Sequence, residues 1–141
     1  MSVDPGDLAA LHAKCFTTPR PWTSAEFADW LADLKTIFIG NKHAFLLGRV
    51  VLDEAELLTI AVAPAARRRG AGKGLVLEFE ESARLRGAAT SFLEVAADNM
   101  AAIALYTGCG YSESGRRTGY YRAMNAAATD AILLSRPLIL P

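Results

Sequence analysis

The order in which helical and strand-like patterns follow one another is the feature that most limits the fold of this chain. Two amphipathic helical segments come first, and three short strand-like runs separated by turn residues follow them. A helix, a strand, a second helix and two strands complete the sequence. Short consecutive strands form an antiparallel meander, and intervening helices pack on the sheet that the strands build. The order α-α-β-β-β-α-β-α-β-β therefore predicts an α/β fold of the mixed α+β kind, with a mostly antiparallel central sheet flanked by helices.

Local patterns set the approximate bounds of these elements. Asp4 and Pro5 supply cap and turn chemistry before the first helix, and Thr23 to Glu26 form a capping box before the second. A later short helix, Asn99 to Thr107, is expected to take Asp98 as its cap. The other predicted elements are a helix over Gly72–Arg86 and strands over Thr36–Ile39, His43–Leu52, Glu56–Val62, Ser91–Ala96, Tyr111–Arg117 and Ala131–Pro137.

Length and composition exclude several classes of protein. The chain has 141 residues, which predicts a single domain over 1–141 that buries roughly 70% of its unfolded surface. Fifteen basic and fifteen acidic side chains cancel, so coating of nucleic acid is not expected. No apolar run approaches the ~20 residues that cross a bilayer, and no signal peptide is visible, which predicts a cytoplasmic protein. Cys15 and Cys109 are expected to be reduced thiols, and no Cys/His spacing predicts a metal site.

A basic, glycine-rich turn between a strand and a helix is the clearest candidate ligand site. Its sequence is Arg67-Arg68-Arg69-Gly70-Ala71-Gly72-Lys73-Gly74. Glycines let a backbone approach a ligand closely, and the unpaired N–H groups at the start of a helix attract anions. The turn therefore predicts a site for a phosphate or pyrophosphate, with a solvated turn before an ordinary helix as the alternative.

Three known phosphate-binding patterns could describe this turn. A P-loop fails because Arg67 and Gly74 occupy two of its required positions. A dinucleotide fingerprint fails at its third glycine, which is Leu75, and the preceding strands are predicted to be antiparallel. The pyrophosphate loop of acetyl-coenzyme A binding, Arg/Gln-x-x-Gly-x-Gly/Ala, is satisfied by Arg67, Gly70 and Gly72 at a strand-to-helix junction.

With motifs elsewhere in the chain, the sequence resembles the GCN5-related N-acetyltransferases (the GNAT superfamily). The resemblance is closest to the RimI type, bacterial enzymes that acetylate the N-terminal alanine of a small-subunit ribosomal protein. It runs from about Pro21 to Pro137. The segments that carry it, all in the family's order, are Pro21–Thr23, Val51–Val62, Arg67–Gly72, Leu93–Asn99, Ala101–Tyr106, Gly110–Tyr111 and Tyr120–Tyr121.

The sequence also departs from the family pattern at three places. The first edge strand of the family is missing or very short here, because the chain starts almost at a helix. Thr107 stands where the family often has Glu, and Gly119 stands where a polar residue usually precedes the tyrosine pair. These departures concern the acceptor side more than the chemistry.

The resemblance implies the GNAT fold, whose central sheet is splayed, and acetyl-CoA as the cofactor and acetyl donor. The backbone of Ile60, Ala61 and Val62 would pair with the pantetheine arm as another strand would, and an N–H near Val62 would polarise the thioester carbonyl. Asn99 matches a residue that contacts the cofactor, with a helix cap as its alternative. The residues implied at the phosphates are Arg67, Arg68, Arg69, Gly70, Ala71, Gly72 and Lys73.

The resemblance also implies two catalytic residues. Glu94 would be the general base that takes a proton from the amine, directly or through a water, and an exposed Glu on a strand face is the alternative. Tyr106 would be the general acid that protonates the departing thiolate, with a core aromatic residue as the alternative.

Aromatic residues match the acceptor side of the family. Trp22, Tyr120 and Tyr121 would wall the slot for a small N-terminal residue, or else pack beneath a loop. His12 and His43 belong to no motif and are interpreted as structural or surface residues. Cys109 is interpreted as packing, because direct transfer needs no acyl-cysteine.

The expected function is transfer of an acetyl group from acetyl-CoA to a protein N-terminus in a ternary complex, with a ribosomal protein as the partner. No nucleic acid, no membrane and no metal are expected as partners, and the chain is expected to be a monomer or weak homodimer. Three alternatives remain. One is a lysine side chain or small amine as acceptor, the second a non-catalytic acyl-CoA-binding module, and the third RNA binding through Arg67–Arg69.

Overall fold

The computed structural model describes residues 3–16, 20–67, 70–121 and 128–139. In these residues the elements follow the predicted order, with one added 3₁₀ helix, Pro64–Ala66. The helices are α1 (Pro5–Cys15), α2 (Ser24–Ala32), α3 (Ala71–Leu85) and α4 (Met100–Gly108). The strands are β1 (Thr36–Asn41), β2 (Ala44–Val51), β3 (Glu54–Val62), β4 (Thr90–Ala96), β5 (Ser112–Tyr121) and β6 (Thr129–Pro137).

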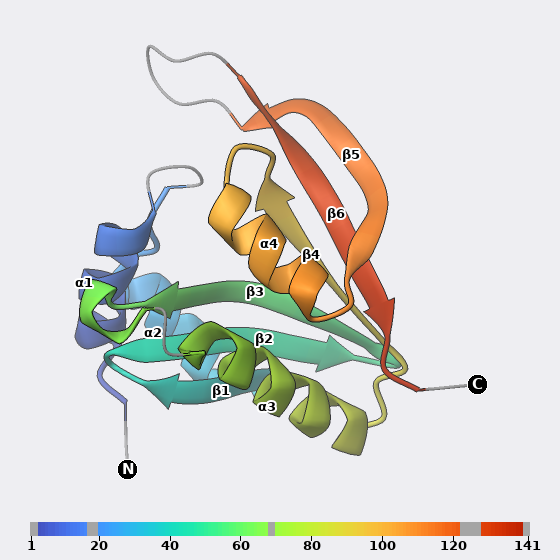
Figure 1. Cartoon of the computed structure of the whole chain (residues 1–141). Coiled ribbons are helices and arrows are strands. Elements are labelled where there is room, and N and C mark those ends of the chain that lie inside the picture. Colours follow the sequence, from blue (N-terminus) through green and yellow to red (C-terminus); the bar gives the residue numbers. More distant parts are fainter. Residues whose placement is uncertain (1–2, 17–19, 68–69, 122–127, 140–141) are drawn as a thin grey trace.

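The strands form one sheet in the order β1-β2-β3-β4-β6-β5. Every neighbouring pair is antiparallel except β3 and β4, which are parallel and pair only from Glu54–Leu57 to Thr90–Leu93. Beyond that point the two strands diverge, which gives the sheet an opening between its two halves (Figure 1). The register against β2 skips Leu58 at the same level, and a bulge of this kind bends a strand. The bulge and the divergence together produce the splayed sheet that was predicted.

Helices cover both faces of the sheet, and each face has its own core. On one face, α3 lies across β1 to β3 and α4 lies beside β4 (Figure 1). Their core is centred on Val76, Phe79 and Leu93. On the other face, α1 and α2 pack against β1 to β3 around Leu8 and Phe27. The opening between β3 and β4 therefore lies between two separately built cores.

Several element bounds differ from the sequence-based expectation. The cap of α4 is Asn99, whose side chain accepts from the Ala102 N–H at 3.2 Å, so the expectation of Asp98 was wrong by one position. Strand β5 continues to Tyr121 rather than ending at Arg117, because pairing with β6 continues across two register shifts. The Thr23 capping box of α2 is confirmed. Within the described residues no strand precedes α1.

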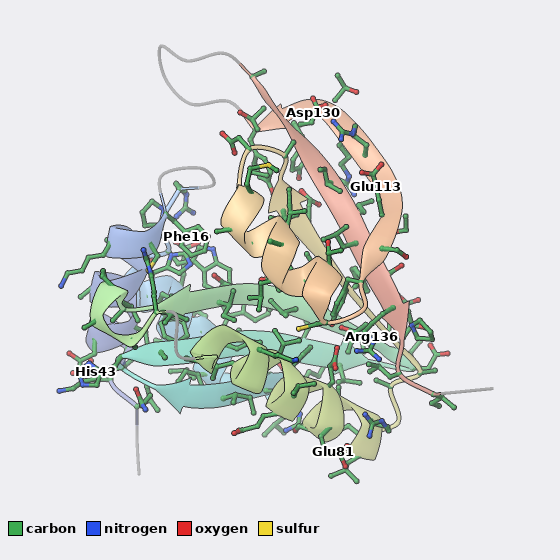
Figure 2. The ribbon with its side chains drawn as sticks, viewed as in Figure 1. Phe16, His43, Glu81, Glu113, Asp130 and Arg136 are labelled. Atoms are coloured by element: carbon green, nitrogen blue, oxygen red, sulfur yellow. The ribbon has the colours of Figure 1, made fainter. Side chains whose placement is uncertain are left out.

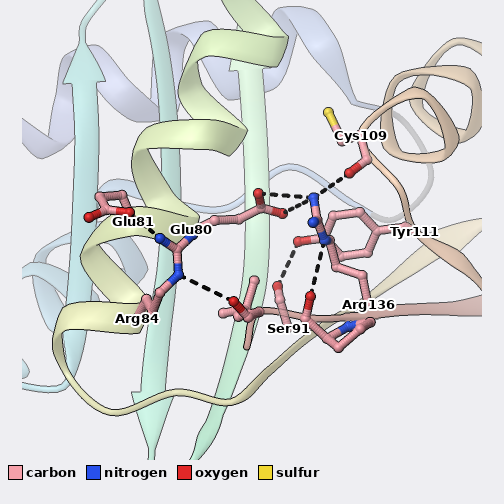
Figure 3. Close-up of polar contacts among 9 residues, drawn as sticks. Glu80, Glu81, Arg84, Ser91, Cys109, Tyr111 and Arg136 are labelled. Carbon is pink, nitrogen blue, oxygen red and sulfur yellow. Dashed lines mark hydrogen bonds and ion pairs between the residues drawn. The ribbon is translucent and has the colours of Figure 1, made fainter. Parts of the chain in front are cut away.

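A buried ion pair closes the end of the molecule away from the opening. The Glu80 side chain on α3 is only 4% exposed and lies 3.3 Å from the Arg136 guanidinium on β6. Figure 3 shows that this guanidinium also reaches the Cys109 carbonyl at the end of α4. Beside them the hydroxyls of Ser91 and Tyr111 are 2.6 Å apart. Burial raises the pKa of Glu80, although Arg136 opposes that shift. The network joins α3, α4, β4 and β6.

Arg136→Met is expected to destabilise the protein strongly, because it leaves the Glu80 carboxylate buried without its cation. Removing one partner of a buried pair costs about 3–5 kcal/mol, which corresponds to a melting temperature lower by on the order of 10 °C in a chain of this size. Arg84→Met, which removes an exposed pair with Glu81 and one hydrogen bond to the Leu138 carbonyl but leaves no buried charge unpaired, is the matched control and should change the stability much less. Thermal unfolding measures both, and equal effects would contradict a special role for the buried pair.

Candidate active site

Two adjoining cavities occupy the opening between β3 and β4. The larger, ≈ 560 Å³, lies between the edge of β3, the turn before α3 and the start of α4. The smaller, ≈ 90 Å³, lies deeper between β3 and β4 and is lined by both Glu94 and Tyr106. The two cavities share Phe16, Ile60, Asn99 and Ala102 as lining residues. Figure 2 shows Phe16 between α1 and the beginning of α4. Their common wall makes one site with a wide and a narrow part.

The wide part has the features of an anion site. Gly70 is the N-cap of α3 with φ +73°, a left-handed conformation that favours glycine, and no side chain caps this helix end. The first intrahelical bond is donated by Gly74 N–H to the Gly70 carbonyl, so the preceding N–H groups of α3 have no intrahelical acceptor. Gly70, Ala71, Gly72 and Lys73 all line the cavity. Helix geometry and one lysine therefore favour a negatively charged group there.

The arginines of the turn divide into two groups. Arg68 and Arg69 lie outside the described residues. Arg67 lines the wide cavity, but its Nε donates to the Val62 carbonyl at 3.0 Å and its Nη2 lies 3.6 Å from Cys15 Sγ. In this structure Arg67 therefore joins the turn to the end of β3. A contact to a bound anion would have to use its remaining N–H groups.

The edge of β3 provides a second feature of the wide part. Ile60, Ala61 and Val62 line the cavity, and β4 does not pair with β3 beyond Leu57. The other edge of β3 is occupied by β2. Backbone groups along Leu58–Val62 that face the opening, other than the Val62 carbonyl that Arg67 and Cys15 contact, are therefore available to an extended ligand, as a sheet edge is.

Glu94 enters the narrow cavity from β4. Its neighbours Leu93 and Val95 belong to the core beneath α3 and α4, so the alternation of the strand turns Glu94 toward the face that carries α1. The Tyr121 hydroxyl, from β5, donates to Glu94 Oε1 at 3.1 Å. Burial and the nearby Glu94 carboxylate raise the pKa of Tyr121, so this hydroxyl keeps its proton. Sequence reasoning had assigned Tyr121 only to the acceptor wall.

Tyr106 reaches the same cavity from α4. The residue is buried, and its ring packs edge-on against Tyr111 with centroids 5.9 Å apart. Burial raises the pKa of Tyr106 well above its ordinary value. The hydroxyl is therefore protonated at every pH at which the fold would be studied. The Glu94 carboxylate, from β4, and the protonated Tyr106 phenol, from α4, therefore line the same narrow cavity.

The other residues predicted for the site differ in whether they line the two cavities. Trp22 lines the narrow cavity, and Asn99 lines both cavities while also capping α4. Tyr120 is half exposed, packs on Tyr121 and lies beneath the Arg117 guanidinium, and it lines neither cavity. The structure brings Trp22 and Tyr121 to the site and leaves Tyr120 at its margin.

His12 is the functional candidate that sequence reasoning missed. It is 1% exposed and lines the narrow cavity, whereas His43 is exposed on the surface (Figure 2). The available signal was its spacing, since His12 follows Leu8 by four residues on the buried stripe of α1. Burial lowers the pKa of His12 to about 4, with nearby Glu26 opposing the shift. The imidazole is therefore neutral at pH 7.

The other chemistry-bearing groups are easily placed. Cys15 and Cys109 are free thiols, and burial raises the pKa of Cys109. No group of three or more His, Cys, Asp or Glu side chains suited to a metal occurs in the part of the chain that the structure describes. Among the same residues, no helix is both long and apolar enough to span a membrane.

Comparison with known proteins agrees with this arrangement. The family model described as "Acetyltransferase (GNAT) family" matches residues 7–111. The [Ribosomal protein bS18]-alanine N-acetyltransferase of Escherichia coli K12 is 37% identical over 97% of this chain and 95% of its own length. The N-alpha-acetyltransferase RimI of Mycobacterium tuberculosis is 36% identical over 85% of this chain and 80% of its own length. The crystal structure of the E. coli ribosomal-protein-S18-alanine N-acetyltransferase superposes with a TM-score of 0.84, 33% identity, and coverage of 98% of this chain and 90% of that one.

The fold and these similarities define an acetyl-CoA-dependent N-acetyltransferase. The chain belongs to the acetyltransferase (GNAT) family. The sequence-based predictions of the GNAT fold, of N-acetyltransferase activity and of acetyl-CoA as the donor are thereby confirmed. The wide cavity also fits that donor chemically, because it combines an unpaired strand edge with an uncapped helix N-terminus.

Gly70→Asp is expected to weaken acetyl-CoA binding by roughly 10-fold or more, because it places a carboxylate at the start of α3, where a phosphate is attracted. A Cβ at Gly70 meets no atom within 4 Å, so charge rather than collision should dominate. Gly70→Asn is the matched control, since Asn has the same size and tolerates a positive φ without the charge. Titration calorimetry with acetyl-CoA measures both variants. Equal affinities of the Asp and Asn variants would refute an anion site at this turn.

Stability is expected to fall between pH 6.5 and pH 4 because His12 is held neutral in the fold. The unfolded chain binds a proton at His12 below pH 6.5 while the folded chain does not, so the free energy of unfolding decreases as the pH falls through this window. The loss attributable to His12 approaches on the order of 3 kcal/mol at pH 4, at 1.36 kcal/mol per pKa unit. Urea midpoints at pH 7, 5.5 and 4.5 should converge for the parent and His12→Phe as the pH falls. The same slope in both proteins would contradict this origin.

Proposed function

We propose that this enzyme acetylates the α-amine of a protein N-terminus, and that its acceptor is the N-terminal alanine of a small-subunit ribosomal protein. The observation that carries the proposal is that Glu94 and Tyr106 line one narrow cavity adjoining the wide cavity at the start of α3. Relatives named for acetylation of the alanine of ribosomal protein bS18 support the acceptor. A ribosomal-protein acceptor also implies action in the cytoplasm.

The size of the narrow cavity favours a small first residue. The narrow cavity has a volume of ≈ 90 Å³, counted as the space open to the centres of water-sized groups. One water needs about 10–15 Å³ on that measure, so the cavity holds on the order of six to nine such groups. An amine with an alanine methyl and its carbonyl fits that number, and a long first side chain does not. Trp22, Phe16 and Leu58 form apolar walls, which suit a methyl group.

The residues divide the work of transfer by their chemistry. Acetyl-CoA supplies the acetyl group as a thioester. Glu94 takes the proton that the attacking amine loses, and Tyr121 holds one carboxylate oxygen in place through its hydrogen bond. Tyr106 donates toward the departing sulfur as the C–S bond breaks. The start of α3, with Lys73, binds the phosphates, and the backbone of Ile60 to Val62 binds the pantetheine arm.

The assignment treats residues 1–141 as one acetyltransferase domain acting as a monomer or weak homodimer. Its support is that a single chain supplies Glu94 from β4, Tyr106 from α4 and the anion turn before α3. Asn99 is assigned both to the cap of α4 and to the cofactor, because it lies where the two cavities meet.

A peptide panel tests the acceptor. The panel holds a ribosomal-protein peptide that begins with Ala, the same peptide beginning with Leu, and an N-terminally blocked form that retains an internal Lys. Acetylation of the Ala peptide alone, located by mass spectrometry, is the expected result. Acetylation of the blocked peptide would shift the acceptor to lysine. In cells, loss of the gene should leave the N-terminal alanine of one ribosomal protein unmodified.

A further inference from the structure

His12 links two walls of the narrow cavity. Its Nδ1 accepts the backbone N–H of Trp22 at 2.9 Å, and its Nε2 lies 2.8 Å from Thr59 Oγ1 on β3. The ring stacks on Phe16 with centroids 4.3 Å apart and lies 5.3 Å from the Trp22 ring. Phe16, Trp22, Thr59 and His12 itself all line the narrow cavity.

The hydrogen bonds fix the protonation of this imidazole. A backbone N–H can only donate, so Nδ1 must carry the lone pair, and the neutral ring then has its proton on Nε2. Nε2 therefore donates to Thr59 Oγ1. Both ring nitrogens are occupied by these contacts, which leaves His12 no free nitrogen to take a proton from an amine. Its chemistry suits holding the wall rather than transferring protons.

Trp22 and Thr59, the two residues that His12 connects, lie on segments that belong to no common helix or strand pair. Trp22 lies in the stretch between α1 and α2, and Thr59 lies on β3 beyond Leu57, where pairing with β4 has ended. Ile60, which follows Thr59, lines both cavities. The two hydrogen bonds of His12, to Trp22 and to Thr59, are called the His12 bridge. This bridge therefore sets the distance between the aromatic wall and the β3 edge to which the acetyl donor is assigned.

We propose that His12 is a positioning residue for the acceptor amine, acting by fixing Trp22 and Phe16 against Thr59 of β3. The inference rests on the proposed function, since it assigns the narrow cavity to the acceptor. A histidine that merely filled the core would affect stability alone. A positioning histidine also affects the KM for the acceptor while leaving the donor site intact, because the wide cavity is built mainly from other residues.

The test compares variants at each end of the bridge. His12→Phe keeps an aromatic ring among Phe16, Trp22 and Phe27 but removes both hydrogen bonds. Thr59→Val removes only the β3 end, and Thr59→Ser restores its hydroxyl. Val76→Ala, in the core beneath α3, is the control for lost stability without any change to this site. KM and kcat are measured for the Ala-initiated peptide and for acetyl-CoA.

His12→Phe should raise the peptide KM roughly 10-fold or more, since small misplacements at a reacting centre are costly. Thr59→Val should raise it less, Thr59→Ser should resemble the parent, and the double variant should be no worse than His12→Phe, because the two residues act through one contact. The KM for acetyl-CoA should stay within about twofold. An unchanged peptide KM in His12→Phe, a parallel rise in both KM values, or additive effects would overturn the proposal. If His12→Phe does not fold, the two Thr59 variants decide.

A readout without acceptor separates this inference from the proposed function. Hydrogen exchange of the Trp22 amide, followed by NMR, should be slow in the parent and fast in His12→Phe, because its acceptor Nδ1 is gone. Equally slow exchange in both proteins would overturn the bridge. If the parent acetylates no N-terminal peptide but passes this exchange test, the proposed function fails and the bridge stands. The KM comparison is then made with the amine that the parent does acetylate.

Discussion

Glu94→Gln is expected to lower kcat at pH 7 by roughly 10²–10⁴-fold, the contribution usual for a positioned general base. The amide keeps the shape of the side chain and can still accept the Tyr121 hydrogen bond, but it cannot take a proton from the amine. An N-terminal ammonium has a pKa near ~8, so raising the pH supplies free amine without a base. The variant should therefore regain part of its activity as the pH approaches that value. A pH–rate profile with the Ala-initiated peptide measures this.

The control for that experiment is another strand carboxylate. Glu113 lies exposed on β5 (Figure 2), and Glu113→Gln removes one negative charge without touching either cavity. It should behave as the parent does. Full activity of Glu94→Gln at pH 7 would remove Glu94 from the mechanism, and equal losses in the two variants would point to net charge instead.

Local patterns were sufficient to predict most of the fold. Alternating apolar residues and turn signals gave the order of elements, and the Thr23 capping box fixed the start of α2. Gly70 was predicted to lie in a ligand-binding turn because glycine lets a backbone approach a ligand closely, and in the structure it is the left-handed N-cap of α3. The one-residue error at the α4 cap arose because Asp98 and Asn99 are both good cap residues. Sequence alone does not decide between such neighbours.

The parts of the site that sequence did not predict depend on contacts between distant segments. Thr59 is 47 residues from His12, and Tyr121 is 27 residues from Glu94, so no local spacing indicates either hydrogen bond. The His12 contact uses the part of β3 beyond the skipped Leu58, where β3 has left β4. The Tyr121 contact depends on the pairing of β5 with β6 and of β6 with β4. Local periodicity does not determine register.

Arg67 is another residue whose side-chain position could not be predicted from local sequence. Its place in the Arg-x-x-Gly-x-Gly pattern predicted a phosphate contact, but the side chain bonds the Val62 carbonyl. The carbonyl is available because β3 has no partner on that edge. Motif position therefore predicted the strand-to-helix turn, which the structure contains, whereas the direction of the arginine depends on its contact with β3. The assignment of the anion site to the N–H groups of α3 does not depend on that arginine.

Tyr106→Phe is expected to lower kcat by about 10²-fold, with no recovery at higher pH. The expected loss lies at the lower end of the range for a general acid, because burial raises the Tyr106 pKa and so makes its hydroxyl a weak acid. Its effect on the departing sulfur is then mainly that of a hydrogen bond from a buried group, which is worth about 10²–10³-fold for a single donor. Raising the pH supplies more free amine but replaces no donor, so the deficit should be constant from pH 6.5 to 9.

Tyr111→Phe provides the matched control for this variant. Tyr111 is also buried, packs against Tyr106 and bonds Ser91, but it lines neither cavity. Tyr111→Phe should lower the melting temperature and leave kcat near that of the parent. Tyr106→Phe should lower kcat and leave the melting temperature near that of the parent. Acetyl-CoA affinity, measured by calorimetry, should be unchanged in both. A deficit of Tyr106→Phe that disappears as the pH rises, as expected for Glu94→Gln, would assign Tyr106 to deprotonation of the amine rather than to the leaving group.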